Sequence, residues 1–293
     1  MIGIIKRRKL WLIITGIIIS ASLISLLIFG LNLGNDFTGG SLIEIRFIDS
    51  RPDKTALEDA VKNMGVKNIT TQTSGEDAYF IRLETITEDK HQEILGELTK
   101  QYSPLEEKSF ESIGPTIGQE LKRKAIYALL LVSSGIILYL AYSFRKVSGS
   151  VSSWKFGVCA VFALFHDVTV VLGVFSLLGK YLDVQIDSLF VVALLTVLGF
   201  SVSDTIVVFD RIRYNFLKQT GNSVEEMAEQ GVNQTLVRSI NTNFVTLLVL
   251  MALYLFGGET LSWFLLALII GIAAGTYSSV FVASPLLVAW SKK

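Results

Sequence analysis

Long apolar runs dominate the pattern of hydrophobic and polar positions along this chain of 293 residues. Six runs carry few or no charged side chains, and they cover approximately residues 10–31, 125–144, 154–178, 186–209, 240–256 and 261–290. About 20 apolar residues in a helix cross about 30 Å of hydrocarbon, and each run approaches or exceeds that length. The pattern therefore predicts a membrane protein with a six-span α-helical bundle, whose first span lies in residues 1–31 and whose other spans lie in residues 125–293.

The polar segment between the first two runs, residues 32–124, has the pattern of a small folded domain. Ile43, Ile45 and Phe47 alternate with charged residues, as in a strand that buries one face. The pattern continues in the order β-α-β-β-α-β, with elements expected at residues 41–48, 53–64, 66–73, 78–84, 88–102 and 106–113. This order predicts an α+β ferredoxin-like domain between spans 1 and 2.

A second polar segment, residues 218–237, lies between the fourth and fifth runs. Val224, Met227 and Ala228 form one apolar stripe at helical spacing. We expect an amphipathic helix that lies along the cytoplasmic surface of the membrane. It would serve either as a plain connection or as a partner-binding element.

Composition agrees with a membrane protein. Hydrophobic residues make up 51% of the chain, charged residues make up 18%, and the mean hydropathy is +0.53. The 26 basic and 26 acidic residues balance, so no global basic field indicates a nucleic-acid partner. The one cysteine, Cys159, lies inside an apolar run, and a packing role is the simplest interpretation.

Basic residues predict the orientation in the membrane. If the chain starts in the cytoplasm, one outer loop carries Lys180, and the cytoplasmic ends carry Lys6 to Lys9, Arg145, Lys146, Lys155, Arg211, Arg213, Lys218, Arg238, Lys292 and Lys293. This is the bias of the positive-inside rule. We therefore expect a multi-pass membrane protein with cytoplasmic termini and with residues 32–124 outside.

Asp204 is the anomaly in the fourth run. Six positions, about 9 Å of helix, separate it from Asp210 at the polar end of the run. A charge near the centre of a spanning helix costs about 2.5 to 3.5 kcal/mol on insertion scales, so such residues are usually functional. Arg238 opens the fifth run at a similar predicted depth, and we expect an Asp204–Arg238 pair that acts as a proton relay. A static pair, or an arginine that extends to the interface, is the structural alternative.

His166 and Asp167 lie near the middle of the third run and form a second candidate for a proton path. A hydrogen-bonded pair that packs helices is the alternative, because adjacent residues of a helix point in different directions. Gly271 and Gly275 form a G-x-x-x-G in the sixth run, which predicts close helix packing.

The sequence has no motif of an enzyme. It contains no phosphate-binding loop, no H-E-x-x-H and no G-x-S-x-G, so we expect no catalytic residues, no metal and no cofactor.

Four motifs resemble the SecF family, the smaller membrane subunits of the bacterial SecDF translocation factor in the resistance-nodulation-division superfamily. The motifs are D-F-T-G-G at 36–40, G-P-T-I-G at 114–118, His166-Asp167 and S-D-T-I-V-V-F-D-R-I-R at 203–213. Ser203 stands where the family usually has asparagine, and Tyr214 stands where it commonly has glutamate. The resemblance covers nearly the whole chain.

The resemblance implies partners and a cycle. Members of the family pack six helices against six of SecD and use the proton-motive force to help unfolded preproteins leave the SecYEG channel after SecA has driven them in. Asp204 matches the family's proton-binding aspartate, and Arg238 matches its essential arginine. The glycine-rich motifs would form the joints of the outer domain, through the residues Asp36, Gly39, Gly40, Gly114, Pro115 and Gly118.

Two other functions remain open at this point. The chain could be a structural subunit of the translocon that conducts no protons. It could also be a half-transporter for lipids or other amphiphiles, as found elsewhere in the superfamily.

Overall fold

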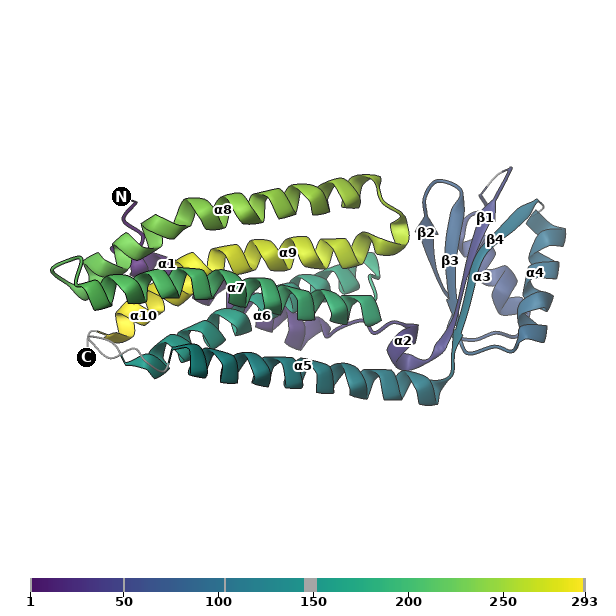
Figure 1. The fold of residues 1–293 in the computed structure, drawn as a ribbon. Coiled ribbons are helices and arrows are strands. Elements are labelled where there is room, and N and C mark those ends of the chain that lie inside the picture. Colours follow the sequence, from purple (N-terminus) through teal and green to yellow (C-terminus); the bar gives the residue numbers. More distant parts are fainter. Residues whose placement is uncertain (1, 50, 103, 145–151, 292–293) are drawn as a thin grey trace. The chain divides into compact units, whose positions relative to one another are not determined.

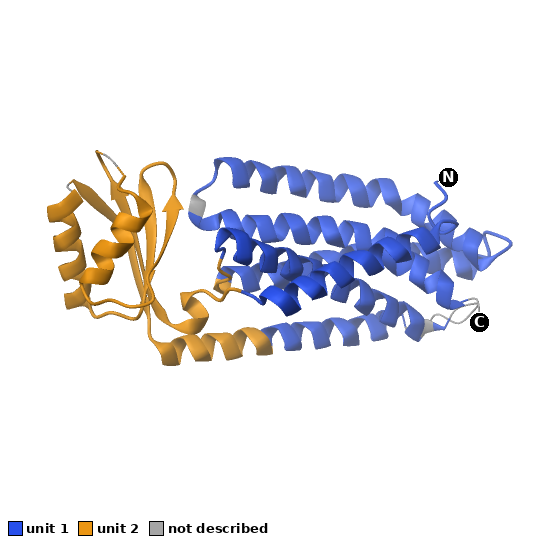
Figure 2. Ribbon diagram, turned by 180° about the vertical axis from the view of Figure 1, so that it is seen from behind, with its two compact units in different colours: residues 1–31, 128–184, 189–293 blue, residues 32–127, 185–188 orange. Residues whose placement is uncertain are grey.

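The structure, a computed structural model, describes residues 2–49, 51–102, 104–144 and 152–291 (Figure 1). The chain divides into two compact units, which are coloured separately in Figure 2. The helical unit comprises residues 1–31, 128–184 and 189–293, and the other unit comprises residues 32–127 with 185–188. The predicted charges at Arg145, Lys146, Lys292 and Lys293 lie outside the described residues.

Six helical segments of the described chain are long and apolar enough to span a membrane, which confirms the six-span prediction. Five of them are α1 (Arg8–Phe29), α5 (Pro115–Ser143), α6 (Ser153–Leu182), α7 (Ser188–Lys218) and α8 (Val224–Phe256). A short 3₁₀ turn, η1 (Glu259–Leu261), precedes the sixth. That segment joins α9 (Ser262–Ser278), a π-helix η2 (Ser279–Ala283) and α10 (Ser284–Ser291) without a break.

The helices extend beyond the predicted spans. The expected surface helix at residues 218–237 does not exist as a separate element, because from Val224 onward this region is the first part of α8. Ser223 caps that helix by accepting a hydrogen bond from the Glu226 amide at 3.2 Å. Hydropathy marks the apolar part of a helix, whereas backbone hydrogen bonding continues through its polar turns.

The second unit contains a four-stranded antiparallel sheet with the order β2-β3-β1-β4. Its elements are α2 (Asn35–Thr38), β1 (Gly40–Phe47), α3 (Lys54–Asn63), β2 (Thr70–Ser74), β3 (Ala78–Leu83), α4 (Glu88–Tyr102) and β4 (Leu105–Ile113). The predicted β-α-β-β-α-β order is thus confirmed. β2 starts later than expected because Asn68 adopts a positive φ of 56°, which breaks an extended strand.

One apolar core joins both helices to one face of this sheet. Ile43 and Ile45 of β1 are fully buried and belong to the same cluster as Leu57 of α3 and Ile94 of α4. The predicted inward face of β1 is therefore the face that α3 and α4 cover. Asp53 caps α3, and hydrogen bonds from the Thr55 hydroxyl and amide lower the pKa of its carboxyl group.

In the helical unit, α1 packs closely on α6. A Cβ atom added to Gly173 would overlap Ser22 of α1. Two hydrogen bonds join the same helices: Ser25 Oγ donates to the Gly173 carbonyl at 3.2 Å, and Ser176 Oγ donates to the Ser25 carbonyl at 3.0 Å. Small residues at such contacts let spanning helices approach.

The segment before α1 is fixed to α8 by a buried carboxylate. Glu229, 4% exposed, accepts hydrogen bonds from the amides of Ile4 and Ile5, each at 2.8 Å. The Ile4 and Ile5 side chains are buried in the core of the bundle. This contact holds the start of the chain against the first turns of α8.

Candidate functional site

Asp204 lies on α7 and is only partly exposed. Its Oδ1 accepts a hydrogen bond from Ser239 Oγ of α8 at 2.6 Å, and its Oδ2 accepts one from Ser279 Oγ of η2 at 2.6 Å. Both carboxylate oxygens therefore have donors from neighbouring helices. Such donors stabilise the charged form without neutralising it.

Arg238 does not form the expected ion pair. Among the ion pairs of the described residues, none joins Arg238 to Asp204, and the Arg238 side chain is exposed. Consecutive residues of an α-helix point about 100° apart, and here Ser239 takes the inward direction. The sequence-based pairing was therefore wrong for this conformation, and Ser239 occupies the place given to Arg238.

His166 and Asp167 lie on α6 with exposed fractions of 1% and 0%. His166 Nδ1 lies 2.9 Å from Asp167 Oδ1, so the adjacent side chains bond to each other. Asp167 Oδ2 accepts hydrogen bonds from Ser278 Oγ at 2.8 Å and from Ser201 Oγ of α7. The other ring nitrogen of His166 is buried and has no hydrogen-bond partner in the described part of the chain.

The two carboxylates accept hydrogen bonds from two neighbouring residues of the sixth span. Ser278 is the last residue of α9 and contacts Asp167, and Ser279 is the first residue of η2 and contacts Asp204. Serines from three spans thus surround two acids from α6 and α7. These serines could not be recognised as functional residues from the sequence, because serine is common in packed membrane helices and has no distinctive spacing.

Gly271 and Gly275 lie where α9 contacts α7. A Cβ atom added to Gly271 would overlap the Val197 side chain of α7, and one added to Gly275 would lie 3.1 Å from Ser201 Cβ. The glycines therefore let α9 approach α7 directly beside Ser201, one helical turn before Ser278 and Ser279. α7 and α9, which pack through these glycines, therefore also contribute groups to the polar site.

The two glycine-rich motifs pack on each other within the second unit. Gly39 has a φ of +78°, and a Cβ atom there would lie 2.8 Å from Pro115 Cα. A Cβ atom on Gly118 would lie 2.8 Å from the Gly39 nitrogen, and one on Gly40 would lie 2.8 Å from the Leu83 carbonyl oxygen. These contacts have no room for a side chain. Gly114, in contrast, has open space around it.

Asp36 connects these packed motifs to the start of α7. Its Oδ2 accepts a hydrogen bond at 2.8 Å from the amide of Ser188, the first residue of α7. Ile186 forms a parallel bridge with Leu33, and its carbonyl oxygen accepts from the Gly34 amide at 2.8 Å. A segment between the third and fourth spans therefore belongs structurally to the second unit.

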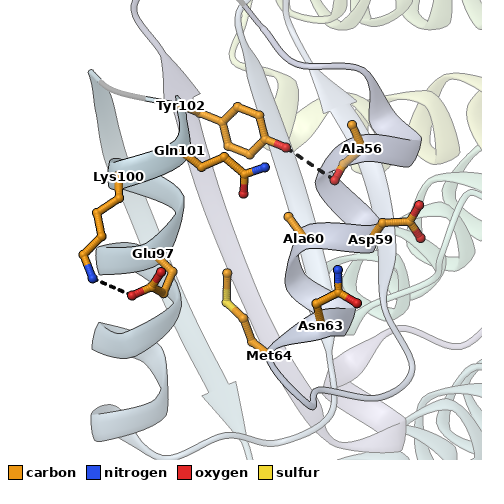
Figure 3. A pocket seen from close by; sticks show the side chains of 9 residues that line it. All are labelled: Ala56, Asp59, Ala60, Asn63, Met64, Glu97, Lys100, Gln101 and Tyr102. Atoms are coloured by element: carbon orange, nitrogen blue, oxygen red, sulfur yellow. Dashed lines mark hydrogen bonds and ion pairs between the residues drawn. The ribbon is translucent and has the colours of Figure 1, made fainter.

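An open cavity of about 590 Å³ lies between α3 and α4 (Figure 3). Its charged side chains are Asp59 and the Glu97–Lys100 ion pair, whose atoms are 2.5 Å apart. The Tyr102 hydroxyl donates to the Ala56 carbonyl at 3.4 Å across it. These groups do not concentrate one sign of charge, and we assign the cavity no role.

Fold and site together define a multi-pass membrane protein of the transporter kind, with an inserted ferredoxin-like domain and two carboxylates inside its helix bundle. Residues 94–293 match the family model "Protein export membrane protein SecD/SecF, C-terminal", and residues 24–47 match "SecD/SecF GG Motif". The chain is 44% identical to the protein translocase subunit SecF of Thermobaculum terrenum, covering 100% of this chain and 95% of that protein. The chain belongs to the SecF family of protein translocase subunits, which confirms the expectation that it is not an enzyme.

Further relatives agree with this membership. SecF of Anaerolinea thermophila is 38% identical over 99% of this chain and 94% of its own length. The crystal structure of SecDF from Thermus thermophilus, described as a translocon-associated membrane protein, matches 99% of this chain with a TM-score of 0.84 and 32% identity. This chain spans 38% of the length of that SecDF chain.

Proposed function

We propose that this chain is the SecF-like half of a SecDF complex that uses the proton-motive force to support export of unfolded preproteins. Its partners are a SecD-like membrane subunit and, through that complex, the SecYEG channel and SecA. The similarity to SecDF supports a SecD-like partner, because the part of that SecDF chain that this chain matches is 38% of its length. We place the protein in the bacterial cell membrane with cytoplasmic termini and the ferredoxin-like domain outside.

Asp204 is the proposed proton-binding group, and one observation carries this assignment. Its carboxylate lies among three spanning segments and is held by two serine hydroxyls instead of a cation. A fixed arginine partner would keep the carboxylate charged, whereas hydroxyl partners serve both the charged and the neutral form. The group can therefore gain and lose a proton without an ion pair having to break.

Arg238 and the His166–Asp167 pair complete the proposed pathway. Arg238 immediately precedes Ser239 in α8, so a rotation of that helix by about 100° would exchange the two at Asp204. We propose that Arg238 replaces Ser239 in another step of the cycle. His166, with one free ring nitrogen inside the bundle, is the group that would pass protons to Asp167.

Movement would reach the outer domain through α7. Asp204 lies on α7, and the first residue of that helix is hydrogen-bonded to Asp36 of the D-F-T-G-G motif. We propose that a shift of α7 on protonation moves this motif and the packed G-P-T-I-G motif together.

The test compares Asp204→Asn with Asp210→Asn, an exposed acid further along α7 that serves as the matched control. The full chain is purified with its copurifying partner and placed in vesicles, where proton flux is measured, and preprotein export is measured in cells at equal abundance of the complex. We expect Asp204→Asn to abolish flux and export support, and Asp210→Asn to leave both near the original level. Full flux and export with Asp204→Asn would refute the relay and favour the structural-subunit alternative.

A further inference from the structure

Ser279 lies within hydrogen-bond distance of two acceptors. Its Oγ is 2.6 Å from Asp204 Oδ2 and 3.2 Å from the carbonyl oxygen of Thr276, three residues earlier in the helix. A serine hydroxyl carries one hydrogen and two lone pairs, and the hydrogen rotates to suit its surroundings. Ser279 can therefore donate to the carboxylate or to the backbone, but it cannot donate fully to both.

Ser278 repeats this geometry at the other acid. Its Oγ is 2.8 Å from Asp167 Oδ2 and 3.2 Å from the Gly275 carbonyl oxygen, again three residues earlier. The Gly275 carbonyl already accepts the Ser279 amide, and a carbonyl oxygen has a second lone pair for the hydroxyl. Each of these two consecutive residues thus has two alternative acceptors, a carboxylate oxygen and a backbone carbonyl oxygen.

We propose that Ser279 is a positioning residue that turns its hydroxyl hydrogen between Asp204 and the helix backbone as Asp204 loses and gains a proton. When Asp204 is charged, Ser279 donates to it. When Asp204 is neutral, its own O–H donates to the serine oxygen, and the serine hydrogen turns to the carbonyl. At Asp167 this exchange does not follow, because Ser201, which has no second acceptor in the described part of the chain, donates to the same Oδ2 as Ser278. This inference rests on the proposed function, in which Asp204 binds the transported proton.

The other two serines cannot adapt in this way. Ser239 contacts Asp204 Oδ1 and Ser201 contacts Asp167 Oδ2, and neither hydroxyl has a second acceptor among the described residues. If Asp204 carried its proton on Oδ1, the Ser239 hydrogen would lose its acceptor inside the bundle, which is unfavourable. The proton of Asp204 is therefore expected on Oδ2, the oxygen that faces Ser279.

The backbone around Ser278 and Ser279 is unusual. The helix changes from α to π at Ser279, and π-helices occur mainly as single turns, often at functional sites. The Ser279 carbonyl accepts a hydrogen bond from the Ser284 hydroxyl at 3.1 Å. Ser278 and Ser279, which face acids on two different helices, therefore lie at this transition.

Other titratable groups on the surrounding helices must be separated from this effect. They include His166 and Asp167 on α6, Asp210 and Arg211 further along α7, Arg238 on α8 and Tyr277 on α9. The serine variants below change none of these groups. Each carboxyl group is identified by its own Asp→Asn variant.

The experiment is an infrared titration of the purified full chain, in which the carbonyl stretch of each protonated carboxyl group is assigned by its loss in Asp204→Asn or Asp167→Asn. We expect Ser279→Ala to shift the Asp204 band to higher frequency, because the carboxyl O–H loses its acceptor, and to leave the Asp167 band in place. Ser278→Ala, at the other acid, should leave the Asp204 band in place. Ser279→Thr should restore the Asp204 band, since threonine retains the hydroxyl. Ser176→Ala is the matched control, because that buried hydroxyl bonds only to a backbone carbonyl, and it should shift neither band.

Two results would overturn the inference, and they differ. If the Asp204 band is present but has the same frequency in Ser279→Ala, the serine has no such role while the proposed proton site survives. If no band disappears in Asp204→Asn at any pH at which the chain stays folded, Asp204 binds no proton, and the proposed relay fails together with the inference.

Discussion

Gly39 and Gly118 lie where the two glycine-rich motifs pack on each other, and the structure allows the effect of a substitution there to be sized. Gly39→Ala introduces a residue at φ +78° and places its Cβ 2.8 Å from Pro115 Cα. Gly39 has ψ 157°, and this combination of φ and ψ is essentially restricted to glycine, so a residue with a side chain held there costs about 1–3 kcal/mol. Forcing an atom into a packed contact typically costs about 1–3 kcal/mol. We therefore expect about 2–6 kcal/mol of local destabilisation, if the two effects add.

Three other glycines separate the two contributions. Gly118→Ala introduces only the steric overlap, because Gly118 does not have a positive φ. Gly65→Ala introduces only the backbone strain, because Gly65 has a φ of +81° and open space around it. Gly114→Ala adds neither and lies in the same motif as Gly118. Helical alanine is otherwise favoured over glycine by about 0.5–1 kcal/mol, so a loss of stability in Gly118→Ala would come from the contact alone.

The assay is amide hydrogen exchange of β1 and β4 in the full chain in detergent, which gives local opening free energies. Export in cells at equal abundance of the complex is measured beside it. We expect the order of destabilisation at the joint to be Gly39→Ala, then Gly118→Ala, then Gly114→Ala, with export support falling in the same order. Equal exchange in Gly118→Ala and Gly114→Ala would refute the claim that the two motifs are in tight contact.

Three further predictions concern other parts of the chain. Glu229→Gln should weaken the hydrogen bonds that hold the start of the chain on α8, because a neutral amide oxygen accepts backbone N–H groups less strongly than a carboxylate. Hydrogen exchange at the Ile4 amide should accelerate by about tenfold, for a loss of about 1–2 kcal/mol in hydrogen-bond free energy. Gly173→Ala should lower the thermal stability of the bundle by overlap with α1, whereas Gly16→Ala on α1, with open space around it, should not. Capping hydrogen bonds lower the pKa of Asp53 below its usual value of 3.8. The stabilisation of α3 by Asp53 should therefore be complete above pH 3.8 and be lost as the pH falls through the lowered pKa. Asp53→Asn should remove this pH dependence, which is measured as hydrogen exchange of the α3 amides.

Each of these has an outcome that would contradict it. Unchanged exchange at the Ile4 amide in Glu229→Gln would mean that the apolar contacts of Ile4 and Ile5 alone hold the segment. Equal melting temperatures for Gly173→Ala and Gly16→Ala would contradict the close approach of α1 and α6. An acid profile of α3 exchange that is the same with and without Asp53 would show that its capping contributes no pH dependence.

Much of the architecture could be predicted from local patterns. Hydropathy located all six spans, and the alternation of Ile43, Ile45 and Phe47 identified the buried face of β1, because burial in lipid or in a core acts on each residue type separately. The ends of the helices were less predictable. The first turns of α8 are polar, and their helical state depends on backbone bonding and on Glu229, which contacts a segment more than 200 residues away in the sequence.

The partners within the site were predicted less well than its acids. Asp204 and Asp167 stand out because a carboxylate is rare inside an apolar run. Arg238 was the most obvious partner in the sequence, since opposite charges attract, but the orientation of α8 gives the inward position to Ser239. One residue along a helix changes the direction of a side chain by about 100°, and depth in the membrane alone does not specify that direction.

The sequence by itself determined which residues are expensive to bury and where the chain must cross the membrane, because both follow from transfer free energies of individual side chains. It also determined the order of elements in the ferredoxin-like domain. Only the tertiary structure decided that Ser201, Ser239, Ser278 and Ser279 surround the acids, and that Asp36 joins the glycine-rich motif to the start of α7. These contacts join residues that are far apart in the sequence, so they depend on how the glycines let the helices and motifs pack, which no local pattern contains.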